Sequence, residues 1–228
     1  MAVILPPGAI NRGEPVAPRP SATVLLVRES EPWELLLVRR PGGADFAPGA
    51  YVFPGGTVHA DDRGAADEIK AAAVRELFEE TGILLAAGAT EPECAEIREL
   101  VAGGLTFDAA LRQRGLEPAY DDLVLFARWV TPALLSRRYD ARFYLALMPA
   151  GQTVVPQAGE VVDWTWISPR RALDDAQVTL VYATRSVLET VATGESIDEL
   201  FTRARSLSEI PVVEPRMVET ESGWVVER

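Results

Sequence analysis

The sequence predicts a layered α/β domain that carries a helical insertion and C-terminal helices. Short apolar runs of strand length alternate with segments of helical periodicity along the chain, which is typical of helices packed on a sheet. The length of 228 residues corresponds to one domain with an embellishment. Apolar residues make up 48% of the chain and charged residues 25%, so the composition is that of a globular protein with a sizeable core.

The first half of the chain contains three predicted strands and one strong helix. Residues 1–20 are rich in proline and glycine and predict an extended lead-in without a regular element. Strands are expected over three apolar runs, at 22–28, 34–39 and 51–53, the last of which ends at Pro54-Gly55-Gly56. After a polar loop, the spacing of apolar residues predicts a helix from about Ala65 to Thr81, which Gly82 ends.

The second half begins with a predicted helical insertion, about 93–118, that breaks at Gly103-Gly104. Further strands are expected at 123–130, 142–148 and 161–167, and further helices from Ser168-Pro169 and at 178–193 and 196–206. The chain is expected to be extended from Pro211 onward. The predicted organisation is therefore an N-terminal lead-in (1–20), one domain (21–206) and an extended C-terminal tail (207–228).

The composition excludes several classes of site. The net charge of −12 disfavours nucleic acid or an anionic membrane surface as a partner, because both attract basic proteins. Lys70, Cys94 and His59 are each the only residue of their type, which excludes a P-loop, an internal disulfide and a zinc site built on cysteines or several histidines. No apolar run reaches the ~18 residues of a membrane span and no signal-peptide pattern is present, so a cytoplasmic location is expected.

Three carboxylates crowd one face of the predicted helix at 65–81. Glu76, Glu79 and Glu80 are spaced i, i+3 and i+4, while apolar residues occupy the opposite face. A solvated acidic face is the alternative interpretation. Against it, negative charge in the last helical turn is unfavourable by about 0.3–1 kcal/mol per group, and mutual repulsion adds about 1 kcal/mol in water. A divalent cation would relieve both costs, and Mg²⁺ favours such oxygen ligands.

These residues resemble the Nudix box. The run Arg75-Glu76-Leu77-Phe78-Glu79-Glu80-Thr81-Gly82-Ile83 matches the second half of the box, R-E-U-x-E-E-x-G-U, and Gly56 stands where the leading glycine belongs. The resemblance implies the Nudix α/β/α sandwich with a mixed sheet. It departs from the standard box at its first glutamate, where Asp67 stands, and in its loop, which has ten residues between Gly56 and Asp67 instead of five.

A lengthened loop is similar to that of the coenzyme A diphosphatase branch of the superfamily. The upstream segments 35–40 and 49–56 resemble that branch's coenzyme A motif, although Ala44-Asp45 occupies the place of the motif's second arginine. Downstream, 129–132 and 142–144 resemble the W-[IV]-T-P and R-F segments of the same branch. The resemblance covers most of 21–205.

The resemblance also assigns roles. Glu79 and Glu80 would bind Mg²⁺ or Mn²⁺, with the Gly56 carbonyl as a further ligand. Glu76 would bind metal or accept a proton from the attacking water, and Arg75 would orient the carboxylates. Gly55 and Gly56 would line the substrate site.

Three residues outside the box are candidates with open alternatives. Glu160 is a candidate for a further metal ligand, and the alternative is a solvated acid at a loop end. Arg39 and Arg40 end a strand just before the box and are candidates for holding a substrate phosphate; the alternative is surface charge. The insertion either shapes the substrate pocket or makes a homodimer contact.

The expected function is metal-dependent cleavage of the pyrophosphate in a nucleoside diphosphate linked to another group. Coenzyme A or an acyl-CoA is the leading substrate, and ADP-ribose, dinucleotides and nucleoside triphosphates are the alternatives within this chemistry. A non-catalytic Nudix module that senses a nucleotide is the alternative from another class.

Overall fold

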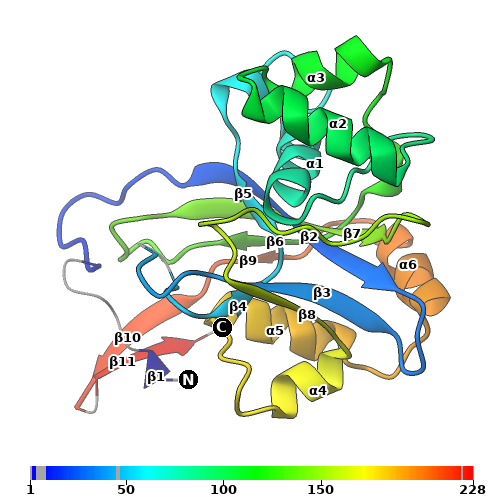
Figure 1. Ribbon diagram of the computed structural model, residues 1–228. Helices are drawn as coiled ribbons and strands as arrows, with labels where there is room; N and C mark the ends of the chain where they lie inside the picture. Colours follow the sequence, from blue (N-terminus) through cyan, green and yellow to red (C-terminus); the bar gives the residue numbers. More distant parts are fainter. Residues whose placement is uncertain (1, 4–8, 45–46, 222, 228) are drawn as a thin grey trace.

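The computed structural model describes residues 2–3, 9–44, 47–221 and 223–227. A mixed β-sheet forms the centre of the molecule (Figure 1), with the strand order β4-β3-β2-β7-β6-β9; in addition, β5 pairs with β2 and β8 pairs with β3. Two pairs are parallel, β2–β7 and β6–β9, and the others are antiparallel. The strands are β2 (Arg19–Arg28), β3 (Glu34–Arg39), β4 (Tyr51–Val52), β5 (Gly55–Thr57), β6 (Val124–Val130), β7 (Tyr139–Leu147), β8 (Asp163–Ile167) and β9 (Val212–Val213).

Helices cover both faces of this sheet, which confirms the predicted α/β/α sandwich (Figure 1). One face carries α1 (Glu68–Thr81) and the helices of the insertion, α2 (Glu91–Ala102) and α3 (Phe107–Arg114). The other carries α4 (Pro169–Asp174), α5 (Tyr182–Val191) and α6 (Ile197–Arg205). Two short 3-10 helices, η1 (Ala60–Asp62) and η2 (Tyr120–Asp122), lie in loops.

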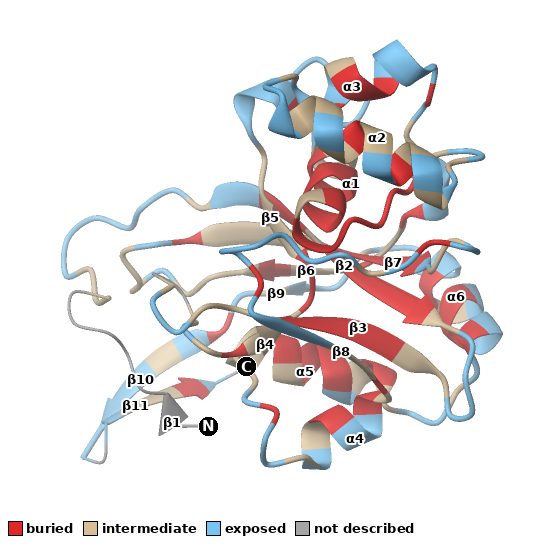
Figure 2. Ribbon diagram, viewed as in Figure 1, coloured by how far each residue is buried: buried red, intermediate tan, exposed pale blue. Residues whose placement is uncertain are grey.

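Strand alternation explains why the core has two halves. Along β2, Val24 and Leu26 pack on the α1 side, whereas Leu25 and Val27 pack on the α5 side. All four side chains are fully buried, and Figure 2 shows buried residues along β2, β3 and α1. Because both faces of this central strand are buried, its residues are apolar without interruption, which explains the continuous apolar run in the sequence.

Several element boundaries differ from the prediction by a few residues. The strong helix begins at Glu68 instead of Ala65, because the Asp67 carboxylate caps it by accepting hydrogen bonds from the backbone N–H groups of Ile69 and Lys70. Strand β8 begins at Asp163 instead of Val161, and α5 begins at Tyr182 instead of 178.

Both ends of the chain contain strands where none was predicted. In the C-terminal tail, β9 joins the main sheet beside β6, and β10 (Arg216–Thr220) and β11 (Gly223–Glu227) form an antiparallel hairpin. In the lead-in, β1 (Ala2–Val3) pairs with β11, and β2 already begins at Arg19. The prediction missed β1 and β9 because their partners, β11 and β6, are distant in the chain. It missed the local hairpin β10–β11 because few of its described side chains are buried, so apolar alternation is weak. Residues 4–8 of the lead-in and Asp45 lie outside the described residues, and the domain limits themselves stay predictions.

No helix in the described ranges has both the length and the hydrophobicity to cross a membrane.

Candidate active site

Helix α1 presents its apolar side to the sheet and its carboxylates to Gly55 and Gly56 at the start of β5. Val74, Leu77 and Phe78 are buried in the core on the α1 side of the sheet. The helix ends at Gly82, whose φ of +73° is the left-handed conformation that suits glycine at this position. This packing fixes the helix and thereby fixes the three glutamates of its last two turns.

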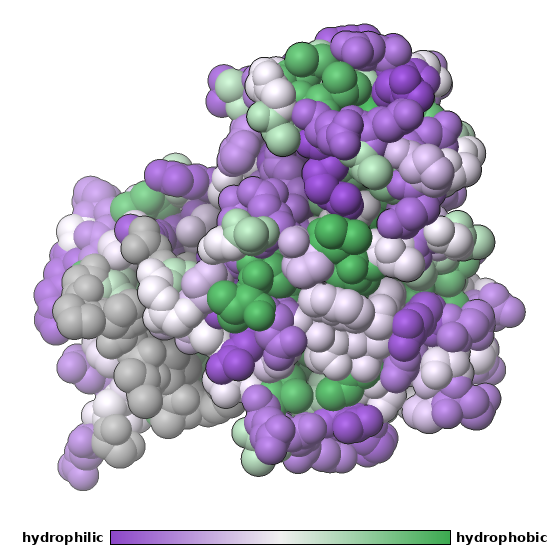
Figure 3. Space-filling view, in the orientation of Figure 1, coloured by the Kyte–Doolittle hydropathy of each residue, from purple (hydrophilic) through white to green (hydrophobic). Residues whose placement is uncertain are grey.

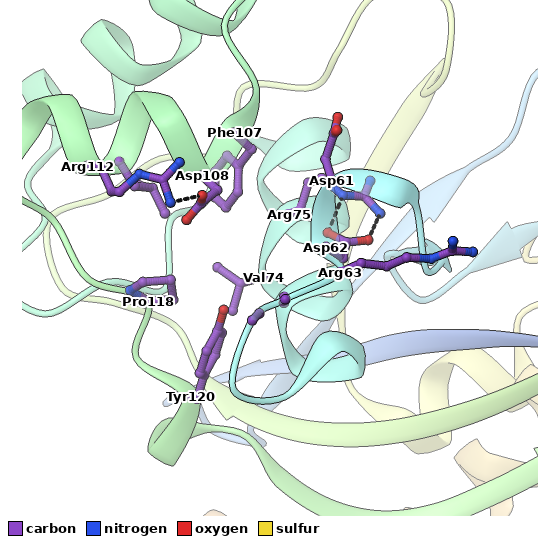
Figure 4. A pocket seen from close by; sticks show the side chains of 14 residues that line it. Asp61, Asp62, Arg63, Val74, Arg75, Phe107, Asp108, Arg112, Pro118 and Tyr120 are labelled. Carbon is purple, nitrogen blue, oxygen red and sulfur yellow. Dashed lines mark hydrogen bonds and ion pairs between the residues drawn. The ribbon is translucent and has the colours of Figure 1, made fainter.

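Arg75 is the centre of a buried ion-pair network. Its Nη1 donates to Glu76 Oε1 at 2.9 Å and to Glu79 Oε2 at 2.8 Å. Its Nε and Nη2 donate to the two carboxylate oxygens of Asp62 at 2.9 and 2.8 Å, and Nη2 also donates to the Thr57 carbonyl at 3.0 Å. Figure 4 shows this two-pronged contact between Arg75 and Asp62. The predicted orienting role of Arg75 agrees with this geometry.

Asp62 is a site residue that the sequence did not single out. It lies at the end of η1 in the lengthened box loop (57–67), it is buried, and its Oδ2 also accepts a hydrogen bond from the His59 backbone N–H at 2.7 Å. Asp67, which occupies the position of the first box glutamate, instead caps α1. The loop holds three aspartates, and spacing alone does not distinguish the one that reaches Arg75.

The two glycines allow the helix to approach the strand closely. At Gly56, an added Cβ would overlap the carboxylate of Glu76. At Gly55, where φ is +154°, an added Cβ would overlap the backbone of Ala22 and Thr23. The Gly55 backbone N–H donates to Glu80 Oε2 at 3.0 Å. The F-P-G-G turn therefore places two helix carboxylates directly against β5.

These contacts predict different effects for alanine at the two glycines. Gly55→Ala is expected to lower the unfolding free energy by about 2–3 kcal/mol, because the methyl group meets backbone atoms in a conformation unfavourable for alanine. Gly56→Ala is expected to cost less, about 1–2 kcal/mol, because no backbone atom is in the way and the Glu76 carboxylate would shift from its 2.9 Å bond with Arg75. Urea denaturation of both variants measures the difference, and equal losses would contradict this account.

Burial shifts the ionisation of the site. Burial raises the pKa of Glu80 to about 8, against a partial opposing effect of the Gly55 N–H. Burial also raises the pKa of Glu76, although the charge and hydrogen bond of Arg75 act in the other direction. For Arg75, burial lowers the pKa, but the hydrogen bonds to Asp62 and the charges of Glu76 and Glu79 outweigh it, so the net pKa is raised.

The shift of Glu80 predicts a pH-dependent stability in the absence of divalent ions. Its carboxyl binds a proton in the folded state up to about pH 8 but has an ordinary pKa of 4.5 when unfolded. The folded chain therefore holds more protons in this range, and the unfolding free energy falls as pH rises from 4.5 through 8. With a chelator present, denaturation of wild type and Glu80→Gln at several pH values measures this contribution, which the variant lacks. An identical pH slope in the two proteins would contradict it.

The connection between β7 and β8 brings Glu160 towards the helix end. Within this connection, Val155 N–H donates to the Thr81 carbonyl at 2.8 Å and Gln157 N–H donates to the Glu80 carbonyl at 3.3 Å. These bonds satisfy carbonyl groups that the end of a helix leaves open. Glu160 is exposed, and its charge contributes to the raised pKa of Glu80. It therefore lies within electrostatic reach of the cluster.

The two candidate arginines are separated by strand alternation. Arg40 lies on the α1 side, and its charge lowers the pKa of Glu80. Arg39 faces the other side, where its Nε donates to the Gly49 carbonyl at 3.2 Å and its guanidinium lies 5.8 Å from the ring centroid of Tyr51. The structure brings Arg40 to the carboxylates and does not bring Arg39 there.

The donor set is chemically suited to a divalent cation. Across the described residues, only one oxygen of each carboxylate is engaged by hydrogen bonds or ion pairs: Glu76 Oε1, Glu79 Oε2 and Glu80 Oε2. The second oxygens and the adjacent Gly56 carbonyl are hard oxygen donors of the kind that Mg²⁺ and Mn²⁺ prefer. In the described ranges, no group of three acidic, histidine or cysteine side chains is arranged to hold a metal ion by itself. A bound cation would therefore also need the Gly56 carbonyl and oxygen atoms of water or substrate as ligands.

The insertion packs on the back of this network. The rings of Phe78 and Phe107 lie 5.3 Å apart, which joins α3 to α1. A hollow of about 170 Å³ lies between the box loop and α3, lined by both Arg75 and the Asp108–Arg112 ion pair (Figure 4). The insertion thus supports the loop that carries Asp62, while its predicted roles at the substrate pocket or in a dimer stay predictions.

Comparison with known proteins agrees with this geometry. The family model for the NUDIX domain matches residues 17–187. The Caenorhabditis elegans protein "Putative nudix hydrolase 7" is 31% identical over 160 residues, which cover 69% of this chain and 54% of that protein. The human "Acyl-coenzyme A diphosphatase NUDT19" is 27% identical over 213 residues, covering 64% and 56%. The chain thus spans about half the length of these curated relatives.

A solved structure supports the same conclusion. The crystal structure of a NUDIX hydrolase from Alicyclobacillus acidocaldarius superposes with a TM-score of 0.67 and 27% identity, covering 82% of this chain and 96% of that one. The fold matches that of this NUDIX hydrolase, and the NUDIX family model covers the helix that bears Arg75 and the three glutamates. This chain therefore belongs to the Nudix family.

Proposed function

We propose that this chain is a metal-dependent pyrophosphohydrolase whose substrate is coenzyme A or an acyl-CoA. The observation that carries the proposal is the set of three α1 carboxylates at the start of β5: Arg75 holds Glu76 and Glu79, and the Gly55 N–H holds Glu80. Such an arrangement concentrates acidic groups in a largely buried place, where divalent cations would balance their charge and in turn attract the phosphate groups of a ligand.

Each residue has a defined task in this chemistry. Glu79 and Glu80 would hold Mg²⁺ or Mn²⁺ together with the Gly56 carbonyl, and Glu160 would join them as a further ligand. When bound, the cation lowers the pKa of a water molecule and neutralises charge on the phosphoryl oxygens. Arg75 keeps Glu76 and Glu79 oriented through its bonds to both and to Asp62.

Glu76 is the preferred proton acceptor. Its carboxylate lies against Gly56, and burial raises its pKa, which makes it a stronger base than an exposed glutamate. Arg40, whose charge lowers the pKa of Glu80, would hold a substrate phosphate through paired hydrogen bonds. The products from coenzyme A would be 3′,5′-ADP and 4′-phosphopantetheine.

Two observations support coenzyme A over other nucleotides. The human relative is named as an acyl-coenzyme A diphosphatase. In addition, the segments upstream of the box, 35–40 and 49–56, resemble a coenzyme A motif, and they form β3, β4 and the turn that supports Glu80.

Steady-state kinetics over a panel of substrates tests the proposal. We expect kcat/KM for coenzyme A species to exceed the values for ADP-ribose, dinucleotides and nucleoside triphosphates, with cleavage dependent on Mg²⁺ or Mn²⁺. A preference for one of the other nucleotides would overturn the substrate but leave the reaction. Failure to cleave any of them with either ion would overturn the reaction as well.

A further inference from the structure

A second hollow lies on the α1 side of the sheet, beyond the connection between β7 and β8. Its volume is about 560 Å³, within the range of small-molecule pockets. The lining is dominated by apolar groups, including Trp164 and Trp166 of β8, Leu147 at the end of β7, and Met148 and Val154 of the connection. Leu147 is 51% exposed and Trp164 37%, so large apolar side chains stand open to solvent here.

An apolar strip leads from the carboxylates to this hollow. Val162, Trp164 and Trp166 are spaced two residues apart, so their side chains share one face. Val162 is 57% exposed and its backbone N–H bonds to the Arg39 carbonyl, next to Arg40. Glu160 precedes Trp164 by four residues, a distance of at most ~13 Å along a strand. In the middle of this face, Figure 3 shows green hydrophobic patches beside a near-white area, where Figure 1 places the connection and β8.

Arg28, Gln152 and Thr153 of the lining are engaged in hydrogen bonds, and Glu29 adds an exposed carboxylate that would repel a phosphate. Arg28 bonds to Glu34 at 2.7 and 3.0 Å and stacks 4.5 Å from the centroid of the Trp166 ring. The Gln152 amide bonds to both backbone groups of Leu84, at 2.8 and 3.0 Å. Thr153 Oγ1 bonds to Glu91 at 2.9 Å. A phosphate bound here would compete with Glu34 for Arg28, and a nucleotide base would compete for side chains that already have hydrogen-bond partners. An uncharged apolar chain needs no cation and no hydrogen bonds, so this lining suits it better.

We infer that the hollow binds the acyl chain of an acyl-CoA whose pyrophosphate lies at the α1 carboxylates. The inference rests on the proposed function and names the part of the substrate that sets its specificity. The pantetheine arm would follow the strip past Val162, and the acyl chain would lie against Trp164 and Leu147. Burying its methylene groups would favour acyl-CoA over free coenzyme A.

Kinetics with two substrates test this assignment. For the wild type we expect kcat/KM for octanoyl-CoA to exceed that for coenzyme A by about tenfold or more. Trp164→Ala is expected to remove most of this preference while coenzyme A turnover stays close to wild type. Leu147→Glu, at an exposed position where the fold tolerates charge, should do the same by placing a carboxylate against the chain. Trp224→Ala, which removes a half-buried tryptophan from β11, is the matched control and should keep the preference.

The outcomes separate this inference from the function on which it rests. Equal kcat/KM for octanoyl-CoA and coenzyme A in the wild type, or an unchanged preference in both hollow variants, would overturn the acyl site and leave a coenzyme A hydrolase. A loss of kcat/KM that is equal for both substrates in Trp164→Ala would assign the hollow to the nucleotide end and also overturn it. Absence of cleavage of either substrate, with cleavage of ADP-ribose retained, would overturn the proposed substrate and the acyl site together.

Discussion

Glu79→Gln is expected to lower kcat by about 100-fold or more at saturating Mg²⁺, with only a small change in the unfolding free energy. Glutamine has nearly the same shape but lacks the charge that would hold a cation. The Glu79 side chain is 29% exposed, so the substitution leaves no large cavity. Arg75 keeps its contacts to Asp62 and Glu76, and the network around it persists.

The matched control for this variant is Glu68→Gln, at the first turn of the same helix. Glu68 is exposed and bonds to the Gly64 backbone N–H, on the part of α1 farthest from Gly82. Its kcat should stay within about twofold of wild type, because it has no contact with the cluster. A kcat near wild type in purified Glu79→Gln would show that Glu79 is not a ligand in the reaction.

Arg75→Lys is expected to lower both stability and turnover, although it conserves charge. The buried Arg75 guanidinium binds both oxygens of Asp62 while it contacts Glu76 and Glu79, and a lysine ammonium lacks this planar arrangement of donors. In the variant, Asp62 would stay buried, but the lysine could not donate to both of its carboxylate oxygens while also contacting Glu76 and Glu79. We expect a loss of about 3 kcal/mol in unfolding free energy, and a fall in kcat as Glu76 and Glu79 lose their orientation.

An exposed pair gives the comparison for Arg75→Lys. Arg128 and Asp140 also form a two-pronged contact, at 2.7 Å for both bonds, but the Arg128 side chain is 39% exposed. Arg128→Lys should therefore cost less than about 1 kcal/mol. Similar losses of unfolding free energy in the two variants, measured by urea denaturation, would show that burial of Asp62 does not determine the effect.

The sequence predicted best where local pattern and tertiary structure agree. The periodicity of α1 and the glycine after it are local signals, and the helix ends at Thr81 as expected. Strand β3 occupies the predicted residues 34–39, because its apolar run is buried on both faces. The spacing of Arg75 and the three glutamates likewise fixes their shared face, since a helix has a regular repeat.

What the sequence missed depends on contacts between distant segments. Asp62 acquires its role because the box loop folds back over Arg75, and neighbouring aspartates give the same local pattern. The separation of Arg39 from Arg40 follows from the register of β3 in the sheet. The hairpin β10–β11 is an exception, because its two strands are neighbours in the chain. Its described side chains are mostly exposed, so the sequence lacks the apolar alternation that marks a strand.

The parallel pairing of β2 with β7 has a consequence for the order in which the protein matures. Residues more than a hundred positions apart, such as Arg19 and Tyr139, must meet before β2 gains its second neighbour. During synthesis, α1 would leave the ribosome well before β7, the strand that completes the sheet beneath this helix. Contacts of such long range form slowly, so the nascent chain would carry an exposed, apolar strand until β7 arrives, and that interval is when it is most open to aggregation or to capture by a chaperone.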